Sequence, residues 1–201
     1  QLKLYEAAID AVIESLDGVR ILSNSFKIIS GEKVGDLKKE SESAEFKLEG
    51  ASLALTEINL DLKSKGENLA LLEVDDFLQV TSQAESLAKL LPQVIPDKGI
   101  KSYLVAFEDS GQLWPTGGRL KTFIRVDFED GKLRKVEEED IGSLEKGLTS
   151  IIEPPEDLKK DLKLTNWTLS TSNFEPDFPT AARQMIWFYE KGSGRGVDGV
   201  L

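Results

Sequence analysis

The segment GQLWPTGGRLKTF, residues 111–123, places two adjacent glycines behind a Pro-Thr pair and just before closely spaced cations. Successive backbone N–H groups in such a turn form a nest that binds anions, and a following arginine closes over the bound group. An ordinary glycine turn into an edge strand has the same composition, so both interpretations stay open. The candidate anion-binding residues are Thr116, Gly117, Gly118, Arg119 and Lys121, joined by Arg183 from a second segment.

That second segment runs from Asn173 to Arg183 and holds Asp177 between Pro176 and Pro179. A carboxylate on so rigid a backbone suits either a magnesium ligand or a helix cap. We favour the cap, with Arg183 pairing with the same carboxylate one turn into the helix. Magnesium, held by Asp177, is the only cofactor that these residues indicate.

Composition excludes several kinds of chemistry. The chain of 201 residues has neither histidine nor cysteine, which removes Ser-His-Asp triads, thiolate nucleophiles, disulfides and the commonest zinc ligands. Its net charge of −11 opposes binding to a nucleic acid or to an anionic bilayer, so nucleic acid is not an expected partner. No window reaches the roughly 20 apolar residues of a membrane helix, and the sequence begins at Gln1, so we expect an excerpt of a longer protein.

Residues 1–96 read as a helical region, because all 7 prolines and all 3 tryptophans lie beyond Leu91. Gly18, the Gly31 to Gly35 pair and Gly66 are the expected breaks, with Pro92 closing the last of three or four helices. Two apolar seams with steps of three and four predict an antiparallel helical hairpin, with polar residues such as Glu67 outside. The seams are Ala44, Leu48, Ala51, Leu55, Ile58 and Leu62, and Ala70, Val74, Phe77, Thr81, Ala84, Ala88 and Leu91. Packing within its own domain is favoured over a stalk that binds a protein partner.

Residues 97–201 change to an alternating pattern that predicts an α/β domain. Ile100 to Phe107 reads as a buried strand, and residues 119–128 as a second one. Asp130-Gly131 predicts a hairpin returning through Leu133 to Glu137, after which the acidic run Glu137 to Asp140 leaves the sheet. On the second strand the expected core face is Leu120, Thr122, Ile124, Val126 and Phe128, and the expected cationic face is Arg119, Lys121, Phe123, Arg125 and Asp127.

The rest of this domain alternates helices with a last strand. Pro154-Pro155 opens a helix through Leu164, and residues 178–192 form another with Thr180 as its cap and Gly192 at its end. Val197 to Leu201 begins a strand, and its partner must be reached by a crossover. The fold class is therefore α/β (α+β): an amino-terminal helical hairpin or bundle, then a mixed sheet with packed helices, expected to be truncated at the C-terminus.

Four aromatic side chains offer flat faces on which sugar rings stack: Trp114, Trp167, Phe174 and Trp187. Side chains of this kind are more often part of a core, and Trp187, beside Phe188 and Tyr189, is assigned there.

Four segments follow one another over residues 102–201: YLVAFEDSGQLWPTGG, a double proline, NWTLSTSNFEPDFPTAARQ and VDGVL. Taken in this order, they resemble the bacterial domain of unknown function 4012. The resemblance implies an extracytoplasmic domain of the cell envelope, anchored by a membrane helix that this chain does not contain. It also implies a fold distantly similar to the LytR-CpsA-Psr phosphotransferases, which transfer glycopolymers from polyprenyl pyrophosphate.

The chain departs from that family where cations are expected. Trp114 stands where the family has the arginine before PTGG, and Ser170 and Thr171 stand where it has Arg-Asp. Paired phosphates need cations, although Arg119 and Lys121 would restore positive charge from a different place. We therefore expect a scaffold or binding module, with an envelope glycopolymer or a protein as partner. The alternative is a phosphotransferase that handles a lipid-linked pyrophosphate.

Overall fold

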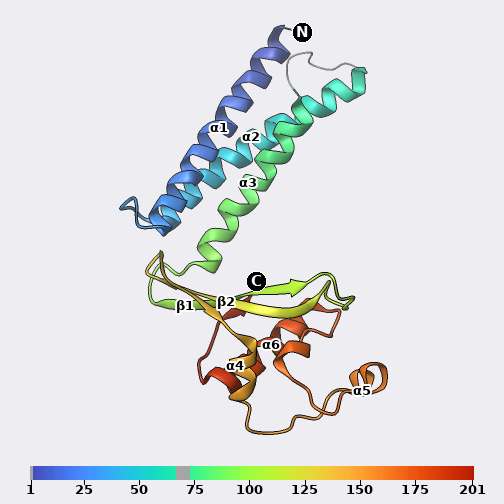
Figure 1. Ribbon diagram of the computed structural model, residues 1–201. Helices are drawn as coiled ribbons and strands as arrows, with labels where there is room; N and C mark the ends of the chain where they lie inside the picture. The colour runs from blue at the N-terminus through green and yellow to red at the C-terminus, as the bar shows by residue number, and fades with distance from the viewer. Residues whose placement is uncertain (1, 67–72) are drawn as a thin grey trace. The chain divides into compact units, whose positions relative to one another are not determined.

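The computed structural model describes residues 2–66 and 73–201 and divides into two compact units (Figure 1). The helical unit comprises Gln1–Gly99 together with the hairpin turn Glu129–Lys132, and the α/β unit comprises Ile100–Phe128 and Leu133–Leu201. An α+β fold, with helices first and a mixed sheet after them, confirms the predicted fold class.

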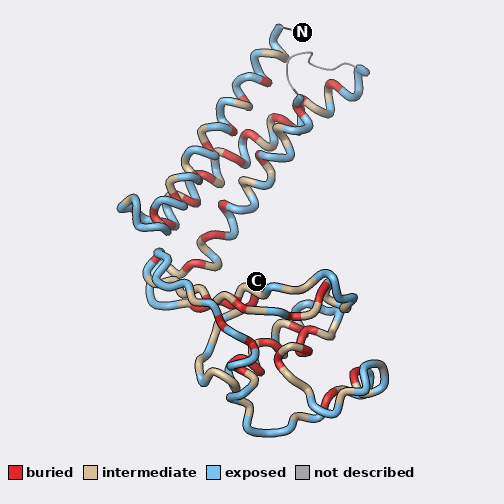
Figure 2. The backbone as a smooth tube through the Cα atoms, in the orientation of Figure 1, coloured by how far each residue is buried: buried red, intermediate tan, exposed pale blue. Residues whose placement is uncertain are grey.

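Within the described residues, the helical unit consists of three helices: α1 (Leu2–Ile29), α2 (Leu37–Lys65) and α3 (Val74–Val94). The α2 helix begins where Asp36 accepts a hydrogen bond from the Lys39 backbone N–H at 3.0 Å, and it ends at Gly66 in the left-handed region. Buried residues follow one side of each helix (Figure 2). Among the described residues, no helix combines the length and apolar composition needed to cross a membrane.

The predicted seams are largely the ones observed. All six seam residues of α2 are buried, as are Val74, Thr81, Ala88 and Leu91 of α3, whereas Phe77 and Ala84 are partly buried. Ala70 and Glu67, which the same prediction used, lie outside the described residues.

Two predicted helix boundaries are wrong. Gly18 is not a break but a buried residue inside α1, where a Cβ would come within 2.6 Å of the Leu48 Cγ, so its role is to let α1 and α2 approach closely. Pro92 does not close α3, which continues to Val94. A proline lacks only one backbone donor, and so near a helix end it removes a single hydrogen bond.

The α/β unit contains a four-stranded sheet in the order β3-β2-β1-β4. Its strands are β1 (Ile100–Asp109), β2 (Arg119–Glu129), β3 (Lys132–Glu139) and β4 (Gly199–Val200). The predicted hairpin joins β2 to β3, and both Asp130 and Gly131 have positive φ, at 49° and 79°. The β4 strand runs parallel to β1, with Leu104 opposite Val200, which confirms the crossover.

The predicted faces of β2 are wrong. Phe123 and Arg125, which were assigned to a cationic outer face, are buried, while Thr122, Ile124, Val126 and Phe128 are only partly buried. Leu120 and Phe123 belong to the same apolar core, so the alternation is broken between them. Another difference is that β3 continues to Glu139, so Glu137 and Glu139 belong to the sheet instead of leaving it.

One face of the sheet is covered by helices that the crossover supplies (Figure 1). These are α4 (Ile141–Lys146), the 3-10 turn η1 (Leu169–Thr171) and α6 (Phe178–Ser193), while α5 (Glu156–Leu162) forms the predicted helix after the double proline. The α6 helix is capped by Asp177, not Thr180, and it ends at Gly194 in the left-handed region, two residues beyond the predicted stop.

Buried apolar residues from the sheet, α4, η1 and α6 form one core. They are Leu104, Leu120, Phe123, Ile141, Leu144, Leu169, Ala181, Met185, Phe188, Tyr189 and Val200. Two glycines allow the ends of α4 and α6 to touch through their backbones. A Cβ on Gly147 would lie 2.2 Å from the Gly192 carbonyl oxygen, and one on Gly192 would lie 2.4 Å from that of Leu144.

Replacing Gly147 by alanine should therefore destabilise the α/β unit, by about 1–3 kcal/mol, because no flexible side chain can move out of the way. Urea unfolding followed by tryptophan fluorescence measures this unit alone, since all 3 tryptophans lie in it. Gly142→Ala, inside α4, is the matched control, because its Cβ would lie 3.4 Å from the nearest atom, an Asp140 oxygen. Equal stabilities of the two variants would contradict the close approach.

Candidate functional site

The PTGG loop connects β1 to β2 and folds against the end of β1. Gly117 has a φ of 120°, and its N–H donates to the Trp114 carbonyl at 3.0 Å. A Cβ on Gly118 would come within 2.7 Å of the Asp109 backbone. The glycines are thus required by a turn and by a close backbone approach, and the Gly117 donor is already used. An acidic side chain, Glu108, also borders the loop, which disfavours an anion at this point.

Asn173 fastens this loop from the second motif. The fully buried Nδ2 lies 2.7 Å from Glu108 Oε1, 2.9 Å from Thr116 Oγ1 and 2.8 Å from the Gly118 carbonyl oxygen. The Thr116 hydroxyl in turn donates to the Asn173 carbonyl oxygen at 3.0 Å. Two segments far apart in sequence are joined in this way. The Asn173 carboxamide oxygen has no partner in the described part of the chain.

Asp177 and Arg183 organise the first turn of α6. The Asp177 carboxylate accepts from the Thr180 N–H at 3.0 Å and from the Thr180 hydroxyl at 2.6 Å. These hydrogen bonds, and the charge of Arg183, hold the pKa of Asp177 below its ordinary value. Arg183 donates to the Thr180 hydroxyl at 2.8 Å. Asp177 therefore caps α6 as predicted, whereas Arg183 donates to the Thr180 hydroxyl and not to the Asp177 carboxylate. Residues 2–66 and 73–201 contain no group of three or more acidic side chains that could hold a metal ion.

Arg119 and Lys121 line a hollow of about 330 Å³ together with Asp109, Gln112 and Ser170. The Arg119 guanidinium donates to the Ser170 hydroxyl at 3.3 Å, and the Ser170 N–H donates to Glu145 at 2.8 Å. Arg183 lines a different hollow, of about 380 Å³, with Trp167 and Trp187. The predicted site residues therefore do not line one common hollow.

A family comparison covers the segments just described. The sequence model for the family described as "Protein of unknown function (DUF4012)" matches residues 98–201. The chain belongs to this family. No curated protein and no solved structure matches the chain. The DUF4012 region takes in the whole sheet, the PTGG loop, Asn173 and α6.

The DUF4012 region also contains a polar network that the sequence did not predict. Its centre is Arg125, 9% exposed, whose guanidinium donates to Asp127 at 2.9 Å, Ser102 Oγ at 2.7 Å, Tyr189 Oη at 3.2 Å and the Gly196 carbonyl oxygen at 3.1 Å. Burial alone would lower the pKa of Arg125, but the contacts with Tyr189 and Asp127 raise it. All three nitrogens of this guanidinium donate hydrogen bonds within the domain, so Arg125 has a structural role.

The network extends to β3 and to the VDGV segment. The Tyr189 hydroxyl donates to Glu139 at 3.0 Å, and Arg195 pairs with both Glu139 and Glu137. The Ser102 backbone N–H donates to the Asp198 carboxylate at 2.8 Å, and the Asp198 backbone N–H donates to the Ser102 carbonyl oxygen at 2.7 Å. The only sequence signal for this network is an arginine between apolar residues of a strand. The same pattern is equally typical of an arginine on a solvent-exposed face.

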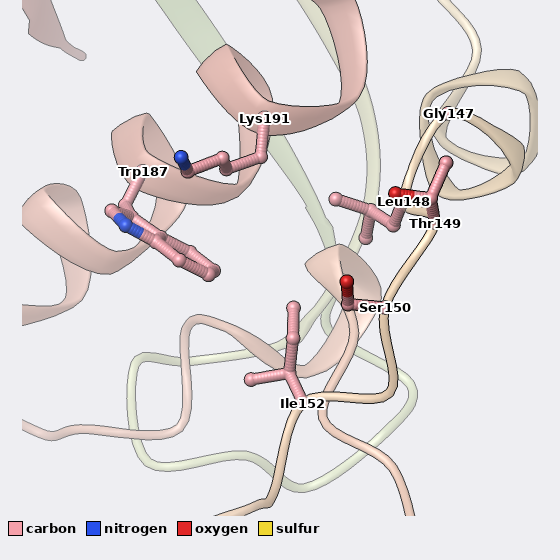
Figure 3. Close-up of a pocket in the computed structure, with 7 residues that line it drawn as sticks. All are labelled: Gly147, Leu148, Thr149, Ser150, Ile152, Trp187 and Lys191. Atoms are coloured by element: carbon pink, nitrogen blue, oxygen red, sulfur yellow. The ribbon is translucent and has the colours of Figure 1, made fainter.

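The aromatic side chains divide into two groups. Trp114 packs edge-on against Phe174 at 5.5 Å, and its buried indole N–H has no partner among the described residues. Trp187 is 43% exposed, so its assignment to the core is wrong. Besides the 380 Å³ hollow, Trp187 borders another one of about 290 Å³ (Figure 3). Lys191 lies beside the indole there, and the loop 147–152 lies opposite.

The Asn173 contacts predict a large stability effect. Asn173→Ala should destabilise the α/β unit by about 2–4 kcal/mol, because Thr116 and the Gly118 carbonyl oxygen lose a buried donor. Asn166→Ala is a suitable control, since that side chain is exposed and accepts one hydrogen bond, from the Ile152 N–H. Urea unfolding followed by tryptophan fluorescence measures the free energy of unfolding of both variants. Equal losses of unfolding free energy would show that Asn173 does not fasten the loop.

Proposed function

We propose that this chain is a binding module of the bacterial cell envelope that performs no catalysis. In this proposal it lies outside the cytoplasm and is attached to the membrane by a segment that this chain does not contain. Its α/β unit serves as a rigid platform, and partners bind at the surface of the two units.

The observation that carries the proposal is that the polar groups of the family motifs bind each other. Thr116 and Asn173 bind one another, Asp177 caps α6 and the Gly117 N–H closes a turn. A catalytic group must instead be directed at the position of a reacting atom. With no histidine or cysteine in the chain, a general base would have to come from the carboxylates, lysines or tyrosines.

Exposed apolar residues on the helical unit support a role in binding a protein partner. Phe46, Leu53 and Leu60 of α2 recur every seven residues and are at least 65% exposed. Each lies two residues from buried ones, so this apolar row occupies the side of α2 opposite its seam. Exposed apolar groups in a row are typical of helices that dock on another helix.

A phosphotransferase that handles a lipid-linked pyrophosphate is the second candidate. It is favoured by one contact, that between Arg119 and Ser170. Ser170 stands where the family resemblance places an arginine, so the guanidinium of Arg119 supplies a positive charge at nearly the same location. Lys121 lines the same hollow, although Asp109 offsets part of this charge.

Calorimetric titration with a polyprenyl-pyrophosphate analogue, with and without magnesium, separates the two candidates. The binding module should give no magnesium-dependent heat, and transfer to a hydroxyl acceptor should be absent. The informative variant is Arg119→Ala with Lys121→Ala, and Lys38→Ala with Lys39→Ala on the exposed surface of α2 is the control of equal charge. Magnesium-dependent binding that only the first pair abolishes, accompanied by transfer, would establish the phosphotransferase instead.

A further inference from the structure

Two hollows of the α/β unit meet at one exposed tryptophan. The first, of about 290 Å³, is lined by the loop 147–152 and by Trp187 and Lys191 of α6 (Figure 3). The second, of about 380 Å³, is lined by Trp167, Arg183 and Gln184 among others. Trp187 and Ile152 line both, so the indole stands between two adjoining spaces.

The indole of Trp187 is held in place although much of it is exposed. Its ring meets Phe188 edge-on, with centroids 4.9 Å apart and an interplanar angle of 90°. Phe188 is fully buried and meets Trp167 in the same way at 5.1 Å. An aromatic ring fixed by a buried neighbour loses little conformational entropy on binding a ligand.

Several polar groups around the indole make no hydrogen bond or ion pair with other described residues. The side chains of Thr149 and Ser150 make no hydrogen bond to another described residue, and Figure 3 shows the Ser150 hydroxyl at the edge of the hollow. The Lys191 ammonium lies 5.9 Å from the Trp187 ring centroid and has no ion pair in the described part of the chain. The Gln184 carboxamide oxygen, at the 380 Å³ hollow, is buried and accepts no hydrogen bond from any residue that the structure describes.

We propose that these hollows bind an acidic sugar residue of a polysaccharide, with its ring stacked on Trp187. The C–H face of a pyranose is apolar and packs on an indole, while its hydroxyls pair with Thr149 and Ser150. Its carboxylate lies toward Lys191. The inference rests on the proposed binding function and names the class of ligand for it.

Local charge is the reason for choosing an acidic sugar over a neutral one. The chain as a whole carries a charge of −11, yet the charged side chain beside the exposed indole is a cation, Lys191. Arg183 adds a second cation at the adjoining hollow, although the nearby Asp177 carboxylate offsets part of its charge. Glu153, the acid next to Ile152 in sequence, is paired with Lys159, and this hydrogen bond lowers the pKa of Glu153. The region therefore attracts a carboxylate despite the net charge.

The indole N–H signals of the 3 tryptophans allow a direct test by nuclear magnetic resonance. The probes are a trimer of galacturonic acid and the matching trimer of galactose, and Trp187→Phe and Trp114→Phe assign the signals of these two residues. The acidic trimer should shift the Trp187 signal in a saturable way and leave the Trp114 signal unchanged, since the Trp114 indole N–H is buried and lines neither hollow. Lys191→Gln should weaken this binding by about tenfold, whereas Lys160→Gln on exposed α5 should not change it.

Three outcomes would overturn the inference: no shift of Trp187, equal affinity for the two trimers, or equal effects of the two lysine substitutions. None of these outcomes would support the phosphotransferase candidate, because the pyrophosphate titration tests the proposed function separately. Magnesium-dependent pyrophosphate transfer would overturn the binding-module proposal whether or not the acidic trimer binds. Lys191→Gln keeps the inference testable if Trp187→Phe fails to fold, because Lys191 is exposed.

Discussion

The α/β unit depends on a guanidinium that is buried in the sheet. Removing an arginine from water is costly unless its donors are paired, and Arg125 finds partners on β1, β2, α6 and the loop before β4. Each partner must therefore take a defined position. Ser102 also binds Asp198 through its backbone, so the same requirement fixes the parallel pairing of β4 with β1.

The orientation of α6 follows from this network and divides the helix into two faces. Tyr189 points inward to Arg125 and Glu139, and Met185 and Phe188 fill the core beside it. Trp187, two residues before Tyr189, falls on the other side, where it is exposed near Lys191. A structural face and a face available to a ligand thus belong to one helix, and the buried network keeps the second face rigid.

Local rules predicted much of this fold. The α2 seam, the Asp130-Gly131 hairpin and the Asp177 cap each depend on a few neighbouring residues, and a sequence shows these directly. The faces of β2 could not be predicted, because both carry apolar residues and the decision depends on partners that come from distant segments. Strict alternation along the strand predicts Arg125 on the outer face, whereas the structure buries it.

The candidate site shows the same limit. Its residue types were identified, but only the fold shows that Asn173 and Thr116 bind each other and that Arg119 and Arg183 line different hollows. Trp187 was misassigned because its neighbours Phe188 and Tyr189 are both buried, and adjacent helical residues lie about 100° apart.

The most direct test of a structure organised around Arg125 is a double-mutant cycle of Arg125→Met and Tyr189→Phe. Unfolding free energies of the two single variants, the double variant and the unaltered chain give the coupling between the side chains. We predict a favourable coupling of about 1–3 kcal/mol, because the Tyr189 hydroxyl loses a donor when Arg125 is removed. If the loss of unfolding free energy in the double variant equals the sum of the two single losses within about 0.5 kcal/mol, the central place of this network is contradicted.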